Sequence, residues 1–292
     1  MIAAFAKPTI NWNDFRNWCL NKFSTKYART LTSYAIQYHP LLNQDFSMLH
    51  NLSRDKRAHI MKALSNLSKY LGCHRHYKQL VEECGVKWER PTSIDIFKNL
   101  YSGNGNSDTL HWAIETSKKL PYKYRFAIIF MALTGLRPIE AITSLNTIAI
   151  QGLTNYYNAD LHVLEHFKYP ELFLRKTKNS FLSIIPDQLK SELEQWQWKL
   201  TYNGLRMAIV NRGMECKLSE LRKFFATYLR EKGIEVETID TLQGRVGSSI
   251  FYKHYWRPDI KQLLQHTSEI LNPITEHLLS EVSTKTNSAA LA

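Results

Sequence analysis

The chain has 292 residues, of which 44% are hydrophobic, and it carries a formal net charge of +12 at pH 7. This apolar content excludes a disordered chain, and the length suits two domains better than one. The basic excess fits either a merely soluble basic protein or one that binds a polyanion such as nucleic acid, because lysine and arginine displace counterions from phosphates.

Cysteine usage and hydropathy indicate a reducing compartment. The cysteines form no CxxC pair and suggest no disulfide framework. Asp14 and Arg16 interrupt the N-terminal apolar residues, so no signal peptide is expected. No apolar run reaches the ~18 residues of a membrane span. We therefore expect a cytoplasmic protein, with no membrane partner, that associates with the nucleoid when it is bound to DNA.

A cluster of histidines and cysteines raises the alternative of a zinc site. Cys73, His74, His76 and Cys84 lie close together in the sequence. Their spacing matches no common structural zinc module, so surface histidines and packed thiols are favoured. We expect neither a metal nor another cofactor.

The first hundred residues predict a helical domain. The aromatic-rich segment Trp12 to Tyr38 indicates one or two helices whose aromatic residues belong mostly to the core. A further helix is expected between Ser53, its N-cap, and Gly72, its end. Its apolar residues recur at helical spacing: Ile60, Leu64, Leu67 and Leu71.

The other face of that helix is almost purely basic. It carries Arg54, Lys56, Arg57, Lys62 and Lys69. Asp55 is the only acid among them. A charged face is ordinarily just solvated, but a face so poor in acids favours contact with DNA phosphates.

A short polar segment predicts the domain boundary. Residues 102–107 contain two glycines and no hydrophobic anchor. We expect a helical domain at 1–102, a linker at 103–107 and a second domain at 108–292, with Pro91 as an alternative boundary. Helices are expected at about 108–119 and 121–133, with Pro121 in the first turn of the second.

The segment Thr134 to Glu140 places an arginine at a sharp turn. Gly135 ends one helix and Pro138 suits the first turn of the next, so Arg137 lies at a helix start near exposed backbone N–H groups. A helix start with a guanidinium group is a natural phosphate site. Glu140 could orient the arginine. The structural alternative is an ordinary loop pair of these two residues.

Residues 161–185 change character and predict a β-hairpin. Apolar runs at 173–175 and 181–185 flank a short polar turn. Lys178 is expected at the tip, where it could protonate the leaving oxygen of a phosphodiester. Lys176 competes for that role and is otherwise a DNA contact, and Lys168 is a third candidate. The structural alternative is a lysine that only keeps the turn soluble.

Helical patterns return at about 187–200, 217–231, 237–242 and 258–282. Arg222 lies beside the apolar face of the second of these helices. It could be a second clamp on the same phosphate, neutralising charge in the transition state, or simply a solvated arginine.

Tyr255 is the candidate nucleophile. A phenol with a pKa near 10 attacks poorly at neutral pH, and nearby cations lower that pKa. Arg245 and His254 are close in sequence and could supply them. The structural alternative is that Tyr252, Tyr255 and Trp256 are packing aromatics. Two arginines, a lysine and a tyrosine together can cleave a phosphodiester without a metal, which points to DNA strand breakage and rejoining.

In order and spacing, these segments resemble the catalytic domain of the tyrosine recombinase (phage integrase) family. They are most similar to integrases of archaeal viruses and plasmids. The resemblance covers about residues 50–260 and rests on the first-arginine motif 134–140, Lys178, the second-arginine box 221–223, and Leu242 to Arg245 followed by Lys253 to Tyr255. Lys56 to Tyr70 and Gly85 to Trp88 resemble the core-binding domain of the archaeal proteins.

The resemblance implies a mainly α fold with a small β-hairpin or sheet, built from a helical core-binding domain and an α+β catalytic domain. It implies a site-specific recombinase that integrates or excises a mobile element through a 3′-phosphotyrosyl intermediate. The implied catalytic residues are Arg137, Lys178, Arg222, Arg245 and Tyr255, supported by Glu140, Ser219 and His254. The implied partner is double-stranded DNA, bound by a homotetramer on paired sites.

The resemblance also implies that the C-terminal segment after Tyr255 docks on a neighbouring subunit. Its apolar anchors would be Leu263, Leu264, Ile270, Leu271 and Ile274.

Two positions depart from the family pattern. Ser219 stands where the family has histidine or lysine, and Lys217 is a possible substitute. Arg245 replaces the usual histidine or tryptophan, and Tyr255 follows it ten residues later, so Tyr252 stays a second candidate nucleophile. The alternatives to a recombinase are a topoisomerase-like relaxing enzyme and a DNA-binding protein that lost catalysis, which Ser219 favours.

Overall fold

The computed structural model describes residues 10–87, 92–101, 105–175, 178–246 and 251–283. The chain divides into two compact units, Met1–Ser102 (unit 1) and Gly103–Ala292 (unit 2). Both are mainly helical, and unit 2 also holds a small antiparallel sheet. The predicted coarse fold class is therefore confirmed.

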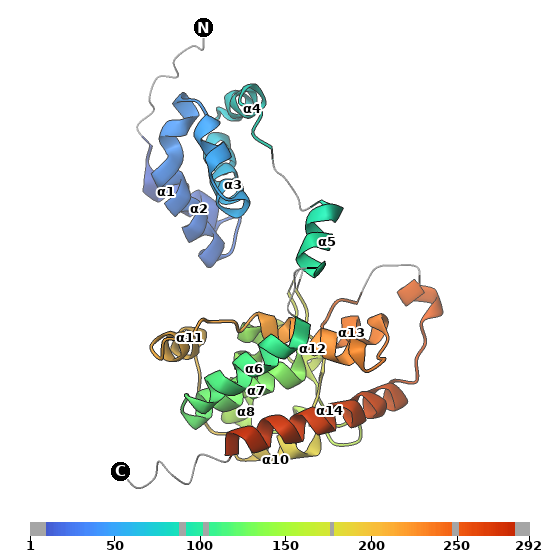
Figure 1. The fold of residues 1–292 in the computed structure, drawn as a ribbon. Coiled ribbons are helices and arrows are strands. Elements are labelled where there is room, and N and C mark those ends of the chain that lie inside the picture. Colours follow the sequence, from blue (N-terminus) through green and yellow to red (C-terminus); the bar gives the residue numbers. More distant parts are fainter. Residues whose placement is uncertain (1–9, 88–91, 102–104, 176–177, 247–250, 284–292) are drawn as a thin grey trace. The chain divides into compact units, whose positions relative to one another are not determined.

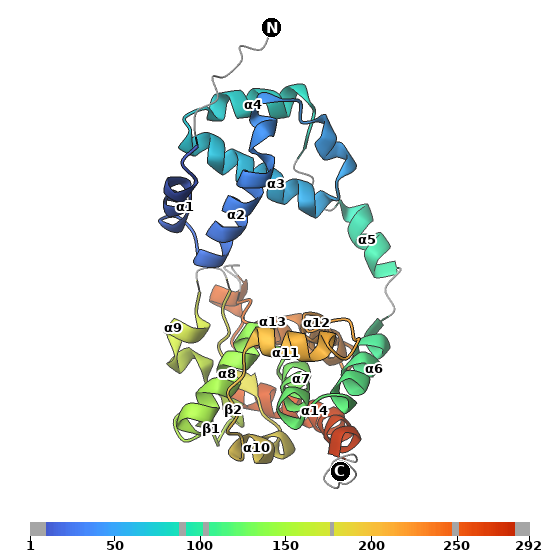
Figure 2. The same cartoon turned by 90° about the vertical axis from the view of Figure 1, so that its left-hand side faces the viewer.

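Unit 1 is a cluster of helices around an aromatic and aliphatic core (Figures 1 and 2). Its elements are α1 (Trp12–Leu20), α2 (Thr25–Tyr38), η1 (His39–Asn43), η2 (Ser47–Asn51), α3 (Arg54–Tyr70), α4 (His74–Glu83) and α5 (Ser93–Tyr101). As predicted, Ser53 is the N-cap of α3, and the chain turns at Gly72 with a φ of 72°. Phe15, Leu31 and Leu64 are fully or almost fully buried where α1, α2 and α3 meet.

The candidate zinc residues of unit 1 have other partners. His74 Nδ1 lies 2.9 Å from Ser68 Oγ, and His76 Nε2 lies 2.9 Å from the Leu42 carbonyl oxygen. The Cys84 thiol donates to Asp45, and Cys73 is buried. Within the described residues, no group of three or more His, Cys, Asp or Glu side chains is arranged to hold a metal.

Unit 2 is built around one buried helix, α7 (Tyr122–Thr134). Every residue from Phe126 to Thr134 is buried, because α7 contacts helices on several sides. Pro121 is its N-cap, one position before the predicted first turn. The surrounding helices are α6 (Gly105–Lys118), α8 (Pro138–Gln151), α10 (Asp187–Glu194), α11 (Tyr202–Val210), α12 (Glu220–Glu231), α13 (Val236–Leu242) and α14 (Ile260–Ser283).

The buried helices of unit 2 are also its most apolar ones. No single helix in the described part of the chain has the length and apolarity needed to cross a membrane. Helices α7 and α8 reach those values only as a pair, and the pair is bent by 115°.

The sheet of unit 2 differs from the predicted hairpin. It joins β1 (Tyr157–Asn158), β2 (Val163–Leu164) and β3 (Ser183–Ile184) in the order β1-β2-β3, all antiparallel. The first residue of the predicted first strand, Phe173, instead ends a short helix, α9 (Pro170–Phe173), because Pro170 starts a helical turn. In the described part of this segment, Leu174 forms an isolated bridge with Asn179 in the predicted turn, and β3 pairs with β2 rather than with residues 173–175.

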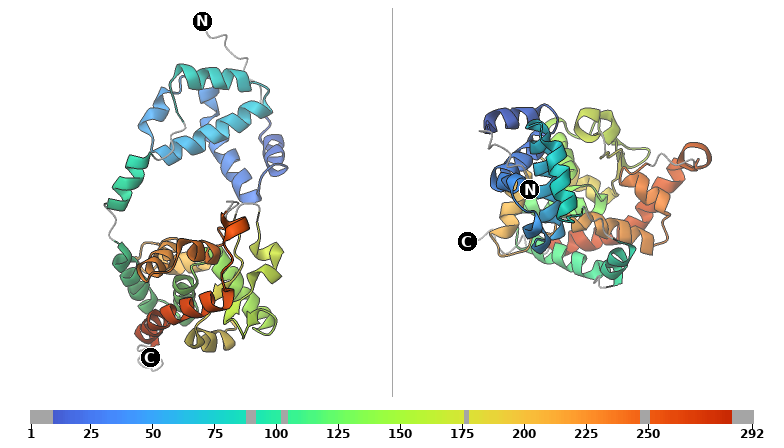
Figure 3. Two further views of the ribbon diagram at one scale, coloured as in Figure 1. Left: turned by 90° about the vertical axis from the view of Figure 1, so that its right-hand side faces the viewer. Right: turned by 90° about the horizontal axis from the view of Figure 1, so that it is seen from above.

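The C-terminal helix α14 lies along unit 2 itself (Figures 1 and 3). It contacts α6, α7, α10 and β3. Leu264, Leu271 and Ile274 are buried there, and Leu263 and Ile270 pack against the same core. In this structure these anchors lie in the core of their own unit, and docking of the C-terminal segment on a neighbour stays a prediction. The apolar stripe of α14 is satisfied within its own chain.

Candidate active site

Arg137 lies at the N-cap of α8, as predicted. Gly135 closes α7 with a φ of 62°, and a Cβ there would lie 2.3 Å from Phe225 Cδ1, so only glycine allows α12 to pack this closely. The carboxylate of Glu140 accepts from the Arg137 backbone N–H at 3.0 Å and from its Nη1 at 2.7 Å. The sequence thus folds the turn so that Glu140 fixes both ends of the arginine.

Arg222 on α12 is buried and held by two backbone carbonyls. Its Nη1 donates to the Gly135 oxygen at 2.7 Å, and its Nη2 donates to the Gln243 oxygen at 2.5 Å. Gln243 returns a hydrogen bond from Nε2 to the Arg222 oxygen at 2.8 Å. The guanidinium therefore connects the turn after α7 with the turn after α13.

Three guanidinium groups share one electrostatic region. Burial first, and then repulsion by Arg137 and Arg245, lower the pKa of Arg222 to about 10, against a smaller raising effect of Glu140 and Asp240. Because this pKa stays well above 7, Arg222 is charged at neutral pH. The predicted cations Arg137, Arg222 and Arg245 are thus brought together.

The loop that bears Lys178 contacts Arg137 and the turn after α13. The Asn179 carbonyl oxygen accepts from Arg137 Nη1 at 3.3 Å. Gly244, with a φ of 65°, packs so tightly there that a Cβ would lie 1.9 Å from that oxygen. Lys178 itself is exposed and next to Asn179 in the chain. Lys176 lies outside the described residues.

A fourth arginine, Arg175, enters the cluster and was missed by sequence reasoning. Its Nη2 donates to Glu140 Oε1 at 2.5 Å. Arg245 pairs with Asp240 at 3.5 Å. Four guanidinium groups against two carboxylates leave an excess of two positive charges, which favours an anionic ligand. The sequence offered no sign of this pairing, because Arg175 and Glu140 are distant along the chain.

The other candidates for the proton donor are placed less favourably. Lys168 pairs with Glu165, and Lys217 pairs with Glu215 at 3.4 Å. Ser219 is an exposed residue at the N-cap of α12 and makes no side-chain capping bond. Among these residues, only Lys178 adjoins a direct contact of Arg137.

Tyr255 is not brought into the arginine cluster. It ends the short π-helical segment η4 (Phe251–Tyr255), which Figure 1 shows beside α13, and its side chain is 73% exposed. In the described structure no hydrogen bond, ion pair or ring contact joins it to an arginine. His254 is also exposed.

Tyr252 is engaged elsewhere. Its hydroxyl donates to the Glu237 oxygen at 3.2 Å, and its ring lies 5.3 Å from that of Trp256. Burial and the acids of α13, Asp240 and Glu237, raise its pKa. Because a phenol with a raised pKa is a poorer nucleophile, these contacts favour Tyr255 over Tyr252.

The predicted basic face of unit 1 forms on α3. Arg54, Lys56 and Lys69 are exposed, and Arg57 and Lys62 are half-buried. Ile60, Leu64 and Leu67 of the same helix are fully buried. The helix is therefore amphipathic as expected. Whether this face contacts DNA stays a prediction.

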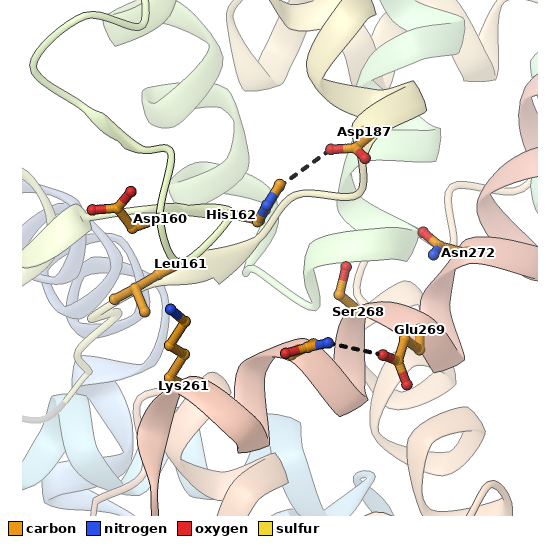
Figure 4. A pocket seen from close by; sticks show the side chains of 9 residues that line it. Asp160, Leu161, His162, Asp187, Lys261, Ser268, Glu269 and Asn272 are labelled. Carbon is orange, nitrogen blue, oxygen red and sulfur yellow. Dashed lines mark hydrogen bonds and ion pairs between the residues drawn. The ribbon is translucent and has the colours of Figure 1, made fainter.

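A polar cavity of about 330 Å³ lies apart from these groups, between the β1–β2 turn and α14 (Figure 4). It is lined by Asp160, Leu161, His162, Asp187, Lys261, Gln265, Ser268, Glu269 and Asn272. Several of these residues pair with one another: His162 lies 3.2 Å from Asp187, and Gln265 donates a hydrogen bond to Glu269 at 3.3 Å. None of its residues belongs to the arginine cluster.

Comparison with protein families gives a match in unit 2. The archaeal phage integrase family model matches residues 106–261, which is more than half of the chain. The matched region contains the whole arginine cluster and Tyr255. No curated protein matches the chain.

Proposed function

The chain belongs to the archaeal phage integrase family, and we propose on that basis that it is a tyrosine-type site-specific DNA recombinase. A protein of this family binds DNA. In the proposed reaction the protein cuts and rejoins DNA through a 3′-phosphotyrosyl intermediate, and so integrates or excises a mobile element. Unit 1 would be the core-binding domain and unit 2 the catalytic domain, working as a homotetramer on paired DNA sites.

The observation that carries this proposal is the arginine pair. A guanidinium group has five N–H donors. Arg222 uses two of them on carbonyl oxygens, and Arg137 uses two on Glu140 and Asn179. Among the described residues, each arginine thus has three further N–H donors without a hydrogen-bond partner, and in the proposed reaction these would bind the phosphate. Groups held in place before the reaction stabilise the charge that builds on a phosphoryl group without reorganising.

The remaining steps use a phenol and a lysine. The Tyr255 oxygen would attack the scissile phosphorus after its proton has left to solvent, and the bond to the 5′ oxygen would break. The Lys178 ammonium would give its proton to that oxygen. General acid catalysis of this kind contributes about 10²- to 10⁴-fold. Because the new phosphotyrosyl bond keeps the energy of the old one, ATP is not needed.

Tyr255 must approach the arginines for this chemistry. Its exposure supports a role that needs access to DNA, and the nearby cations would then lower its pKa. Ser219 supports a second candidate, a DNA-binding protein with impaired catalysis. An exposed hydroxyl stands there in place of the cationic histidine or lysine that the resemblance implies.

The test is to trap the covalent intermediate. Duplexes are first selected for binding from a random-sequence pool, and a nick is then placed at successive positions along the bound sequence. Cleavage beside a nick releases a short fragment and traps the protein on the DNA. We expect an adduct that survives a denaturing gel, is abolished in Tyr255→Phe and persists in the matched control Tyr252→Phe.

The other outcomes separate the alternatives. A bound duplex that yields no adduct at any nick position contradicts the enzyme and supports the binding-only protein. An adduct with relaxation of supercoiled DNA, but without joining of two separate DNAs, supports a relaxing enzyme.

A further inference from the structure

We propose that Arg175 is a positioning residue, which ties the backbone beside Lys178 to Glu140 and so holds the lysine at the phosphate bound by Arg137 and Arg222. This inference rests on the proposed function. It adds a residue to which the sequence patterns assign no role.

The first support is the sharing of one carboxylate. Glu140 is 2% exposed, and its Oε1 accepts from both Arg137 at 2.7 Å and Arg175 at 2.5 Å. Its Oε2 accepts from the Arg137 backbone at 3.0 Å. Charge-assisted hydrogen bonds to a buried carboxylate are short and directional, so Glu140 fixes Arg175 relative to Arg137.

The second support is a set of contacts that join Arg175 to Asn179, the residue that follows Lys178. The backbone N–H of Arg175 donates to Asn179 Oδ1 at 2.9 Å, and Leu174 forms a bridge with Asn179. The Asn179 carbonyl in turn accepts from Arg137 at 3.3 Å. Lys178 precedes Asn179. The residues on either side of Lys178 are thus held to the same pair, Arg175 through Glu140 and Asn179 through Arg137.

The same contacts predict that removing Arg175 spares the fold. Glu140 would keep both of its hydrogen bonds to Arg137, so its buried charge would stay paired. The Arg175 side chain is 43% exposed, and an exposed cation contributes little to folding. Its loss should therefore change where Lys178 stands rather than whether unit 2 folds.

A change of leaving group isolates this effect. In DNA with a bridging 5′ sulfur at the scissile phosphate, the leaving group is a thiolate. A thiol has a pKa of roughly 8.5, far below that of an alcohol, so the sulfur leaves without a proton donor. A residue that acts only by presenting Lys178 becomes dispensable on that substrate. A residue that holds the phosphate through Arg137 stays necessary on both.

The experiment measures adduct formation by the full chain on nicked duplexes with oxygen or with sulfur at the 5′ bridge. Arg175→Ala should slow the reaction of the oxygen substrate about 10- to 100-fold, because a misplaced group loses much of its effect. The reaction of the sulfur substrate should change less than about twofold. Lys178→Ala should give the same pattern, Arg175→Lys a smaller loss, and Arg206→Ala, an exposed arginine on α11, no loss.

Three results overturn the inference: equal slowing of Arg175→Ala on both substrates, no slowing on either, or no rescue of Lys178→Ala by sulfur. Arg175→Lys keeps the test valid should the alanine variant fold poorly, because it retains the charge near Glu140. A wild-type protein that forms no adduct with either substrate contradicts the proposed function itself, which distinguishes that failure from failure of the Arg175 role.

Discussion

At the scale of single residues, unit 2 contains a histidine that is buried in its neutral form. His166 lies between the Tyr156 hydroxyl, 2.5 Å from Nδ1, and the Ser183 hydroxyl, 2.8 Å from Nε2. Tyr156 also donates to Ser144 of α8 at 2.9 Å. Burial lowers the pKa of His166 to about 3. The network connects α8 to the sheet, and burial keeps its imidazole uncharged in the folded chain.

The buried histidine makes folding depend on pH. Below pH ~6.5 the unfolded chain binds a proton at His166 and the folded chain does not, so stability falls as the pH is lowered. Between pH 7 and pH 5 we expect a loss of about 2 kcal/mol from this group. Urea unfolding at both pH values measures it. The loss should be smaller in His166→Gln, and an unchanged pH dependence in that variant would contradict the assignment.

At the scale of elements, the turn after α7 depends on Gly135. An alanine there meets both a left-handed backbone and the ring of Phe225. We expect Gly135→Ala to destabilise unit 2 by roughly 2–4 kcal/mol. Gly213 has a φ of 72° with nothing within 4 Å, so Gly213→Ala should cost only backbone strain, roughly 1 kcal/mol. Equal losses in urea unfolding would show that Phe225 gives way without cost.

The sequence predicted those elements that have local signals. Helix α3 has a repeating apolar stripe and a cap, and Gly135 with Pro138 marks the boundary that places Arg137. The strands are two residues long, too short for a periodic pattern, so local sequence predicts the wrong partner for β3. The contact of Arg175 with Glu140 joins residues 35 positions apart, and no local pattern encodes it.

The position of Tyr255 also could not be predicted from local sequence patterns. The order and spacing of the motifs predict Tyr255 as the nucleophile, yet it is 73% exposed and makes no hydrogen bond, ion pair or ring contact with the arginines in the described structure. In the proposed reaction the partner of Tyr255 is DNA, so neither the sequence nor the fold of the free protein alone can place it at the arginines.

At the scale of the whole molecule, positive charge gathers on both units. The net charge is +12, the arginine cluster of unit 2 has an excess of two positive charges over its carboxylates, and α3 of unit 1 presents the predicted basic face. Each cation that meets a DNA phosphate releases counterions, so affinity falls as salt rises. The slope of the logarithm of the DNA-binding constant against the logarithm of the salt concentration is therefore proportional to the number of phosphate contacts.

The basic face of α3 can be tested by that slope. If Arg54, Lys56 and Lys69 each meet one phosphate, replacing all three with alanine should make the slope less steep by about 2.7, at about 0.9 for each phosphate. The matched control replaces Arg16, Lys26 and Arg29, which are three exposed cations of α1 and α2 in the same unit. Binding of one selected duplex is measured from 50 to 300 mM salt, roughly the range in which such slopes are resolved. The same change of slope in both triple variants would mean that unit 1 binds DNA through its overall charge and not through α3. An unchanged slope in the α3 variant would show that α3 does not contact DNA.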